Sequence, residues 1–302
     1  MERRAVGSLQ VSVVGLGCNN FGRRVDVEGT RRVVDAALDA GVTFFDTADI
    51  YGGTRSETFL GEILDGRRDR VVLATKFGMQ VAPGKQGAAP AYVHRAARDS
   101  LQRLRTDHID LYQLHEPDPS VPIADTLGAL DELVRDGLVR EIGCSNFSAA
   151  QLEEAADAVA DGAARFVSVQ NELSLLEPKD LDDGLACAEK LGLAYIPYFP
   201  LASGVLTGKY RRGERPPAGT RLAGSNEGVS DAEFDRVEAL TRFAADRDRS
   251  LLELAIGWLA SLAPVASVIT GATKPEQIQS NAAATGWRLT DEELAEVARV
   301  IR

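Results

Sequence analysis

The feature of this sequence that most constrains its fold is a regular alternation of short apolar runs with amphipathic stretches of helical period. Continuous apolar, β-branched runs are typical of parallel strands covered on both faces, and the stretches between them fit crossover helices. Eight runs occur, at residues 13–16, 43–45, 71–75, 109–114, 139–143, 166–169, 193–196 and 266–269, with helical candidates at 30–40, 56–64, 90–104, 123–136, 148–160 and 181–191. Eight strand–helix units predict a (β/α)8 TIM barrel of the α/β class.

The ends of several predicted helices are marked by capping residues. Ser148 followed by Gln151 predicts a capping box at a helix start. Gly41, Gly137 and Gly192 stand where helices commonly end in a left-handed residue. These signals support the boundaries drawn from hydrophobic period.

Two further elements are expected outside the eight repeats. Residues 5–6 and 9–11, joined through a Gly-Ser pair, predict an N-terminal β-hairpin that would plug the bottom of the barrel. Residues 290–301 predict a C-terminal helix, and the Gly-, Pro- and Arg-rich stretch 202–230 predicts a long functional loop. No linker divides the chain, so one domain over residues 1–302 is expected.

Charge and cysteine content exclude several classes of protein. The formal net charge is 34 − 45 = −11, and such a surface repels nucleic acid and anionic lipid. Residues 251–269 approach the length of a membrane span, but Gly257 and Pro264 interrupt them and the apolar residues recur at helical spacing, which favours a buried helix followed by a strand. Three widely spaced cysteines, Cys18, Cys144 and Cys187, indicate reduced thiols in a cytoplasmic protein.

Polar residues follow directly on the predicted strands, where the carboxyl ends of a barrel's strands converge on one face. The residues at these ends are Asp46, Lys76, His115, Ser145, Asn146, Gln170, Asn171 and Tyr198. The barrel prediction therefore places them in one pocket.

Lys76 is unusual because the chain contains 28 Arg and only 6 Lys. A compact ammonium at a buried strand end can pair with a carboxylate or shift its pKa. A purely structural Lys76–Asp46 ion pair is the alternative, and His115 could equally be a satisfied core histidine. The three residues together favour a catalytic group.

The sequence does not match the motifs of several common catalytic and nucleotide-binding sites. The run Gly15-Leu-Gly17 begins a dinucleotide fingerprint, but Asn20 occupies its third small-residue position. The segment 204–209 resembles a phosphate-binding loop that is one residue short and is followed by Tyr210 in place of Ser or Thr. The sequence holds no zinc-protease motif, clustered Cys/His set or nucleophile elbow, so no metal site is predicted.

A set of runs spread over the chain resembles the aldo-keto reductase superfamily. The runs are Gly15-Leu-Gly17, Phe45-Asp46-Thr-Ala-Asp49-Ile-Tyr51-Gly, Ala74-Thr-Lys76-Phe, Asp110-Leu-Tyr-Gln-Leu-His115, Gly143-Cys-Ser145-Asn146-Phe, Gln170-Asn171 and Pro200-Leu-Ala-Ser-Gly204. They occur in the family's order from about residue 4 to residue 281. The resemblance implies a barrel that binds NADPH without a Rossmann fold and reduces a small-molecule aldehyde or ketone.

The resemblance also implies a catalytic tetrad of Asp46, Tyr51, Lys76 and His115. Tyr51 would be the general acid, Lys76 would favour its phenolate, and Asp46 would keep Lys76 charged. His115 would orient the carbonyl oxygen. The alternative for Tyr51 is an aromatic side chain packed in a loop.

The cofactor positions implied by the resemblance come from five parts of the chain. The first two strand ends carry Gly17, Cys18, Asn19 and Asp46. The residues that match the carboxamide ligands are Ser145, Asn146 and Gln170. Tyr198 matches the aromatic that stacks on the nicotinamide. Phe199, Pro200, Leu201 and Ala202 meet the pyrophosphate with Lys209 and Arg221, and Gly271, Thr273, Gln277 and Asn281 match the adenosine end.

The sequence also departs from the family pattern. Phe199 replaces a common serine, which leaves only its backbone for the cofactor. Gly271 and Gln277 stand where some subfamilies carry a Lys and an Arg on the 2′-phosphate, so a preference for NADPH would rest on Arg221, Thr273 and Lys274. Glu116 would raise the pKa of His115 if it faced the imidazole, although a solvent-facing Glu116 is favoured.

Two other functions fit parts of the sequence. A non-catalytic NADP(H)-sensing barrel would resemble the accessory subunits of potassium channels, which tend to carry Asn at the position of His115. A Schiff-base aldolase would use Lys76 as nucleophile, but the Asp46 carboxylate keeps that amine charged. The sequence leaves the substrate and the choice between monomer and homo-oligomer open.

Overall fold

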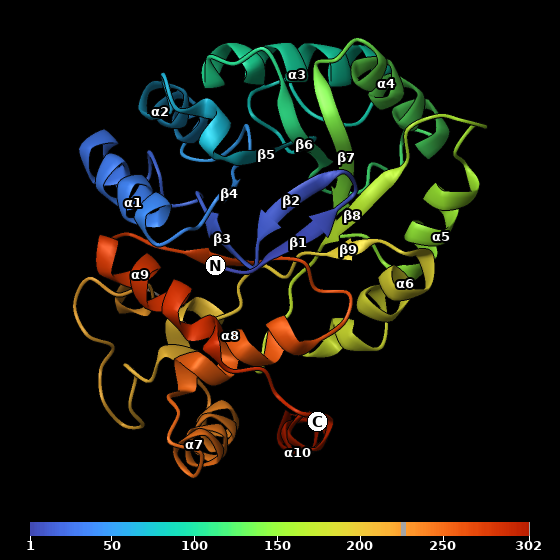
Figure 1. Ribbon diagram of the computed structural model, residues 1–302. Helices are drawn as coiled ribbons and strands as arrows, with labels where there is room; N and C mark the ends of the chain where they lie inside the picture. Colours follow the sequence, from blue (N-terminus) through green and yellow to red (C-terminus); the bar gives the residue numbers. More distant parts are fainter. Residues whose placement is uncertain (225–227, 302) are drawn as a thin grey trace.

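The structure is a computed structural model that describes residues 1–224 and 228–301. Its centre is a sheet of eight parallel strands in the order β10-β3-β4-β5-β6-β7-β8-β9. These strands are β3 (Val14–Gly17), β4 (Phe44–Asp46), β5 (Val72–Phe77), β6 (Ile109–Leu114), β7 (Val139–Ser145), β8 (Phe166–Gln170), β9 (Ala194–Tyr195) and β10 (Val268–Gly271). The sheet curls, and Figure 1 shows it ringed by helices.

The two edge strands are linked by backbone hydrogen bonds. Tyr195 N donates to Pro264 O at 3.0 Å, and Ala266 N donates to Tyr195 O at 2.9 Å. Beyond β9, Ile269 N donates to Pro197 O at 3.0 Å. These bonds satisfy edge groups that would otherwise be unpaired.

The helices form the outer layer (Figure 1). They are α1 (Val27–Asp39), α2 (Arg55–Ile63), α3 (Pro90–Leu104), α4 (Ile123–Arg135), α5 (Ala149–Asp157), α6 (Gly184–Leu191), α7 (Asp231–Ala245), α8 (Leu251–Ser261), α9 (Pro275–Ala283) and α10 (Asp291–Ile301). The α/β class, the eight-stranded parallel sheet and the C-terminal helix expected from the sequence are confirmed.

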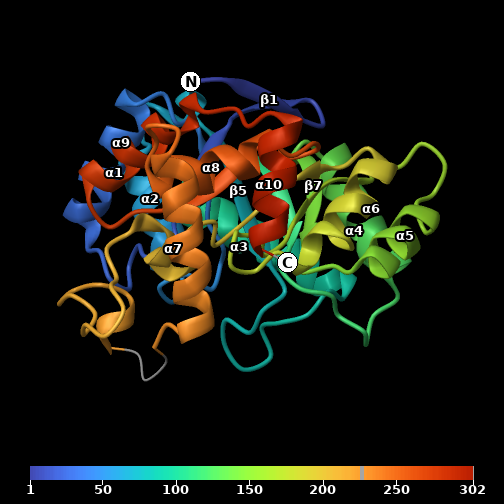
Figure 2. The same cartoon turned by 90° about the horizontal axis from the view of Figure 1, so that it is seen from below.

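The N-terminal hairpin is also confirmed, as β1 (Arg3–Val6) paired antiparallel with β2 (Leu9–Ser12). Val6, Leu9 and Val11 are buried and share one apolar cluster with strand residues such as Phe44 and Leu111. In Figure 2 the hairpin lies at one end of the molecule and the loop that follows β9 extends at the other. The hairpin therefore covers the end of the sheet opposite the carboxyl ends of the strands.

Helix starts follow the caps more closely than the hydrophobic period. The Ser148–Gln151 capping box is present as predicted. Helix α1 begins three residues earlier than expected because Asp26 is its N-cap, and Asp26 Oδ1 accepts from Gly29 N at 2.8 Å. Helix α5 ends at Asp157 rather than at residue 160, and the chain then turns through Gly162 at φ 75°.

Gly41, Gly137 and Gly192 adopt left-handed conformations at φ 78°, 73° and 68°, as predicted for residues that end helices. Helix α6 is shorter than expected because a separate 3-10 turn, Lys179–Leu181, precedes it.

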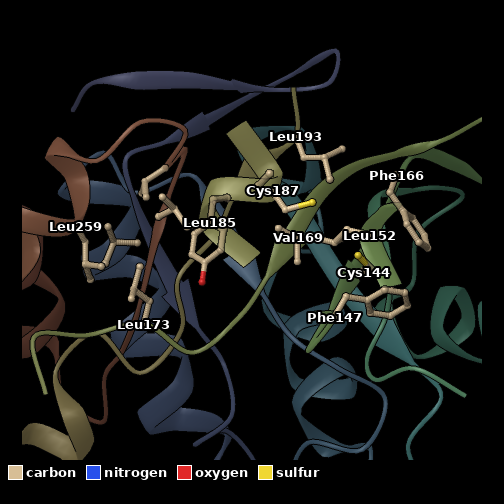
Figure 3. Packing of buried hydrophobic residues seen from close by; sticks show 14 of the residues in the cluster. Cys144, Phe147, Leu152, Phe166, Val169, Leu173, Leu185, Cys187, Leu193 and Leu259 are labelled. Carbon is tan, nitrogen blue, oxygen red and sulfur yellow. The ribbon is translucent and has the colours of Figure 1, made fainter. Parts of the chain in front are cut away.

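The apolar core is thickest between the sheet and its helices. Figure 3 shows Val169 and Phe166 of β8 among residues of the neighbouring helices, including Leu152, Leu185 and Cys187. Close packing of this kind makes truncation of a buried leucine cost about 2–5 kcal/mol.

The apolar stretch 251–269 forms the buried helix α8 and then β10, as predicted. In residues 1–224 and 228–301, no helix combines the length and apolar character needed to cross a membrane. Cys18, Cys144 and Cys187 are buried free thiols.

Candidate active site

Three polar side chains meet at the carboxyl ends of neighbouring strands. Asp46 ends β4, Lys76 is the penultimate residue of β5, and His115 follows β6 directly. Lys76 is fully buried and its Nζ lies 2.6 Å from Asp46 Oδ2. The same ammonium donates to Thr47 O at 3.0 Å. The sheet thus brings the predicted Asp46, Lys76 and His115 to one end.

Tyr51 joins this group from the loop between β4 and α2. Its hydroxyl accepts from Lys76 Nζ at 3.5 Å, and its ring meets His115 edge-on with 5.8 Å between centroids. Gly52 follows at φ 61°, where a Cβ would lie 2.4 Å from Phe21 O. This glycine is therefore needed for the tight turn that presents Tyr51.

The ionisable groups of this cluster influence one another strongly. Burial lowers the pKa of Lys76, but the Asp46 carboxylate and Tyr51 more than offset this effect, so the pKa of Lys76 is raised. Burial also raises the pKa of Tyr51, and the opposing influence of Lys76 is too small to reverse it. Asp46 keeps Lys76 charged as expected, whereas Tyr51 is a protonated phenol at neutral pH.

His115 is neutral in this setting. Burial, followed by the charge of Lys76, lowers its pKa to about 3. Glu116 is exposed and has no part in this shift, so the solvent-facing alternative is correct. His115 Nδ1 is buried without a hydrogen-bond partner in the described part of the chain.

The second oxygen of Asp46 is held by two amides. Gln170 Nε2 donates to Asp46 Oδ1 at 2.9 Å, and Gln113 Nε2 donates to it at 3.3 Å. Sequence reasoning missed Gln113 in this role. The available signal was its position two residues before His115, because alternate residues of a strand share a face.

Sequence reasoning also missed a second group of buried acids, Asp49 and Glu57. Burial and then the charge of Glu57 raise the pKa of Asp49 to about 7. Glu57 is fully buried, accepts from Thr75 Oγ1 at 2.6 Å and pairs with Arg103 at 2.6 Å. Its sequence signal was weak, since a Glu on an amphipathic helix is usually solvated.

The residues predicted to bind the carboxamide are held by one another. Ser145 Oγ donates to Gln170 O at 2.7 Å. Asn146 Nδ2 donates to His115 O at 2.9 Å, and Tyr198 Oη donates to Asn146 Oδ1 at 2.7 Å. Asn146 is in the left-handed region at φ 61°. These contacts hold the polar groups in place beside the Asp46–Lys76 cluster.

The segment after β9 is unusual in its backbone. Phe199, Ala202 and Ser203 have φ of 52°, 43° and 57°, values that non-glycine residues rarely adopt. Such strain tends to gather at binding sites. Pro200 and Leu201, also predicted to meet the pyrophosphate, lie within this segment.

Two basic side chains of the following loop fold back onto this segment. The guanidinium of Arg221 lies over the Phe199 ring, 4.7 Å from its centroid. A Cβ at Gly204 would come within 2.5 Å of Lys209 Nζ. Arg221 therefore lies over the predicted pyrophosphate segment, and Lys209 lies against Gly204, just after it. Residues 225–227 of the predicted long loop 202–230 are outside the described residues.

The predicted adenosine end is formed by β10 and the start of α9. Gly271 pairs in register with Gly17 of β3, which pairs in turn with Asp46. Thr273 N and Oγ1 both donate to Gln277 Oε1, at 2.7 and 3.2 Å.

Beside this turn, Cys18 N donates to Asp46 O at 2.9 Å, and a Cβ on Gly271 would lie 3.9 Å from Asn19 Oδ1. Asn281 is buried, and its Nδ2 has no hydrogen-bond partner in residues 1–224 and 228–301. An unpartnered buried donor at this position fits a ligand acceptor.

Comparison with known proteins agrees with this arrangement. The model of the aldo/keto reductase family matches residues 13–302. The chain belongs to this family.

Among relatives, an uncharacterised oxidoreductase YqkF of Bacillus subtilis is 33% identical, over 97% of this chain and 94% of its own. A probable voltage-gated potassium channel subunit beta of Oryza sativa is 35% identical, over 90% and 87%. Among solved structures, aldo-keto reductase AKR11C1 from Bacillus halodurans in its holo form has a TM-score of 0.85 at 31% identity, covering 100% of this chain and 97% of that one. The chain is therefore an oxidoreductase of a family that uses nicotinamide cofactors.

Proposed function

We propose that this aldo-keto reductase family member, acting as one domain over residues 1–302, reduces aldehydes or ketones to alcohols with NADPH. The observation that carries the proposal is the buried Lys76–Asp46 pair, 2.6 Å between Nζ and Oδ2, with the Tyr51 hydroxyl 3.5 Å from the same ammonium. A proton donor, a charge that stabilises its conjugate base and a neutral imidazole stand together at one strand-end face.

The polar groups of this face support binding of the cofactor. Ser145, Asn146 and Gln170 would hold the carboxamide, with Tyr198 against the nicotinamide ring. Gly17, Cys18 and Asn19 would meet the cofactor at the strand ends beside Asp46, and Phe199 to Ala202 would offer backbone groups to the pyrophosphate. The partnerless Nδ2 of Asn281 would meet the adenosine end. When bound, NADPH supplies a hydride to the carbonyl carbon.

Tyr51, Lys76 and Asp46 would then neutralise the negative charge that develops on the carbonyl oxygen. As the carbon–oxygen double bond opens, its electron pair moves to oxygen, and the Tyr51 hydroxyl gives that oxygen its proton. Proton transfer from a positioned acid contributes about 10² to 10⁴ in rate. The resulting phenolate is stabilised by the Lys76 ammonium, and Asp46 stabilises that ammonium in turn.

His115 acts by position rather than by charge. With a pKa lowered to about 3, its imidazole is neutral at physiological pH and presents one N–H and one lone pair. An N–H beside the carbonyl oxygen would orient the substrate and share its developing charge. The edge-on contact with Tyr51 keeps the two groups on the same oxygen.

The potassium channel subunit beta among the relatives keeps a second function in view, an NADP(H)-sensing barrel without turnover. His115 and the complete Asp46–Lys76–Tyr51 arrangement favour catalysis. A Schiff base on Lys76 is opposed by the raised pKa of its amine, and borohydride trapping with substrate would reveal one.

A panel of aldehydes and ketones, followed by the loss of NADPH absorbance, tests the proposed function. We expect turnover with part of the panel and no trapped lysine adduct. Saturable NADPH binding without turnover on any carbonyl would favour the sensing barrel instead.

A further inference from the structure

A cleft rich in arginine opens beside the predicted adenosine end. Its volume is about 510 Å³, and its lining includes Arg23, Arg24, Arg32, Arg55 and Thr273. The lining comes from the loop after β3, the first turns of α1 and α2, and the turn between β10 and α9. Four guanidinium-bearing side chains around one cleft provide forked donors suited to a phosphate.

Among the described residues, these arginines form no ion pair with an acid, whereas Arg31, next to Arg32, pairs with Glu62 at 3.3 Å. Their hydrogen bonds go to backbone carbonyls: Arg24 donates to Gly219 O at 3.4 Å, and Arg55 Nε donates to Gly52 O at 2.8 Å.

One acid, Asp26, also lines the cleft. Its Oδ1 accepts from Gly29 N at 2.8 Å and so caps helix α1. The cluster therefore keeps a net positive charge in a chain whose overall charge is −11.

A fifth arginine approaches the same place from the opposite loop. Arg221 is exposed as a whole residue. Partial burial of its guanidinium lowers its pKa, and the charges of Arg24 and Arg23 lower it further, against the opposing effects of Tyr210 and Glu172. Like charges near one another repel, and an anion bound among them would relieve that repulsion. The Arg24 contact with Gly219 joins the same two loops across the cleft.

The neighbouring turn has little positive charge of its own. Gly271 and Gln277 contribute none, and the Gln277 amide oxygen is already occupied by Thr273. The remaining cation, Lys274, is exposed at the N-cap of α9. Since a Cβ on Gly271 would lie 3.4 Å from Asn20 Nδ2, the arginine-bearing loop is in contact with this turn.

We propose that Arg23 and Arg24, from the loop after β3, bind the 2′-phosphate of NADPH together with Arg221. This assignment rests on the proposed cofactor binding. It adds the β3–α1 loop to the β10–α9 turn as a determinant of cofactor choice.

The test compares the dissociation constants of NADPH and NADH for the full chain and for Arg23→Ala/Arg24→Ala, measured by quenching of protein fluorescence. We expect NADPH affinity to fall about tenfold or more and NADH affinity to change less than about twofold. Arg31→Ala/Arg70→Ala removes the same charge outside the cleft and should leave both constants within about twofold. Adding Arg221→Ala to the loop double variant should give less than the product of the separate losses, because all three bind one group.

Equal weakening of both cofactors, or no weakening of NADPH, would overturn the assignment. A second arm uses 2′,5′-ADP and 5′-AMP as probes without the nicotinamide half. A preference for 2′,5′-ADP that disappears in Arg23→Ala/Arg24→Ala supports the site even if no carbonyl is reduced. Failure of the proposed function would instead appear as intact NADPH binding without turnover.

Discussion

The Asp46–Lys76 cluster and the arginine cleft differ in how their charges are balanced. In the first, a fully buried ammonium is neutralised by a carboxylate at 2.6 Å, and both carboxylate oxygens are occupied. In the second, Arg23 and Arg24 line one cleft together with Arg32 and Arg55, and none of these side chains forms an ion pair among the described residues. Pairing of every charged group within the protein suits a catalytic centre, whose charges must stay the same through each reaction cycle. Cations without acidic partners suit a binding site, where a ligand supplies the negative charge.

The difference predicts how substitutions will behave in each region. A change in the buried cluster leaves another group uncompensated, so it should affect the chemical step strongly. A change in the cleft removes one of several cations around a ligand and should affect affinity with little effect on turnover.

Tyr51→Phe should give the largest effect. The variant keeps the ring and its contact with His115 but loses the transferable proton, so turnover should fall by about 10² to 10⁴. Cofactor dissociation constants should change little. Retention of more than about a tenth of the wild-type turnover would show that Tyr51 is not the acid.

Lys76→Met tests whether the buried cluster acts as a unit. It should lower turnover through the same proton transfer, so the Lys76→Met/Tyr51→Phe double variant should be little slower than the worse single variant. Stability is measured alongside, because removing one partner of a buried pair costs about 3–5 kcal/mol. Losses that multiply in the double variant would contradict a shared step.

Arg221→Ala addresses the cleft side of the comparison. A charge-assisted contact contributes about 1.5–3 kcal/mol, so NADPH should bind roughly tenfold or more weakly while NADH is nearly unaffected. Lys209→Ala is the matched control, since a cation on the pyrophosphate should weaken both cofactors alike. Equal loss of the two cofactors in Arg221→Ala would show that it does not bind the 2′-phosphate.

Glu116→Gln should give the smallest effect. The pKa of His115 is lowered to about 3, so the imidazole stays neutral as pH rises from roughly 5 to 8 and adds no acidic limb to the rate profile in that range. Since Glu116 is exposed and does not contribute to that shift, its substitution should leave the profile of kcat/KM unchanged. A downward shift of an acidic limb in the variant would place Glu116 against the imidazole.

The two regions also differ in how far they could be predicted from the sequence. Strand period and glycine spacing predicted the parallel sheet, and the strand ends brought Asp46, Lys76 and His115 together as expected. Period alone did not find the start of α1, because the Asp26 cap decides it. The raised pKa of Tyr51 could not be predicted, since it depends on how much water the fold removes.

The cleft was harder to predict because its function depends on missing contacts. Arg23 and Arg24 stand in a loop with no period, and an adjacent arginine pair is usually a solvated surface. Only the structure reveals that their charges reach Arg221, almost two hundred residues later in the chain. Single cations in loops indicate a binding site when several elements bring them together without neighbouring acids.

The most direct test of the account is the fate of the hydrogen delivered to the carbonyl carbon. The wild-type protein is incubated with an accepted carbonyl and NADPH that carries deuterium at both C4 positions of the nicotinamide, and the product is analysed by mass spectrometry. We predict an alcohol carrying one deuterium on the former carbonyl carbon from the wild type and almost none from Tyr51→Phe at equal NADPH saturation. An alcohol formed at the wild-type rate by Tyr51→Phe, or one without deuterium at that carbon, would contradict it.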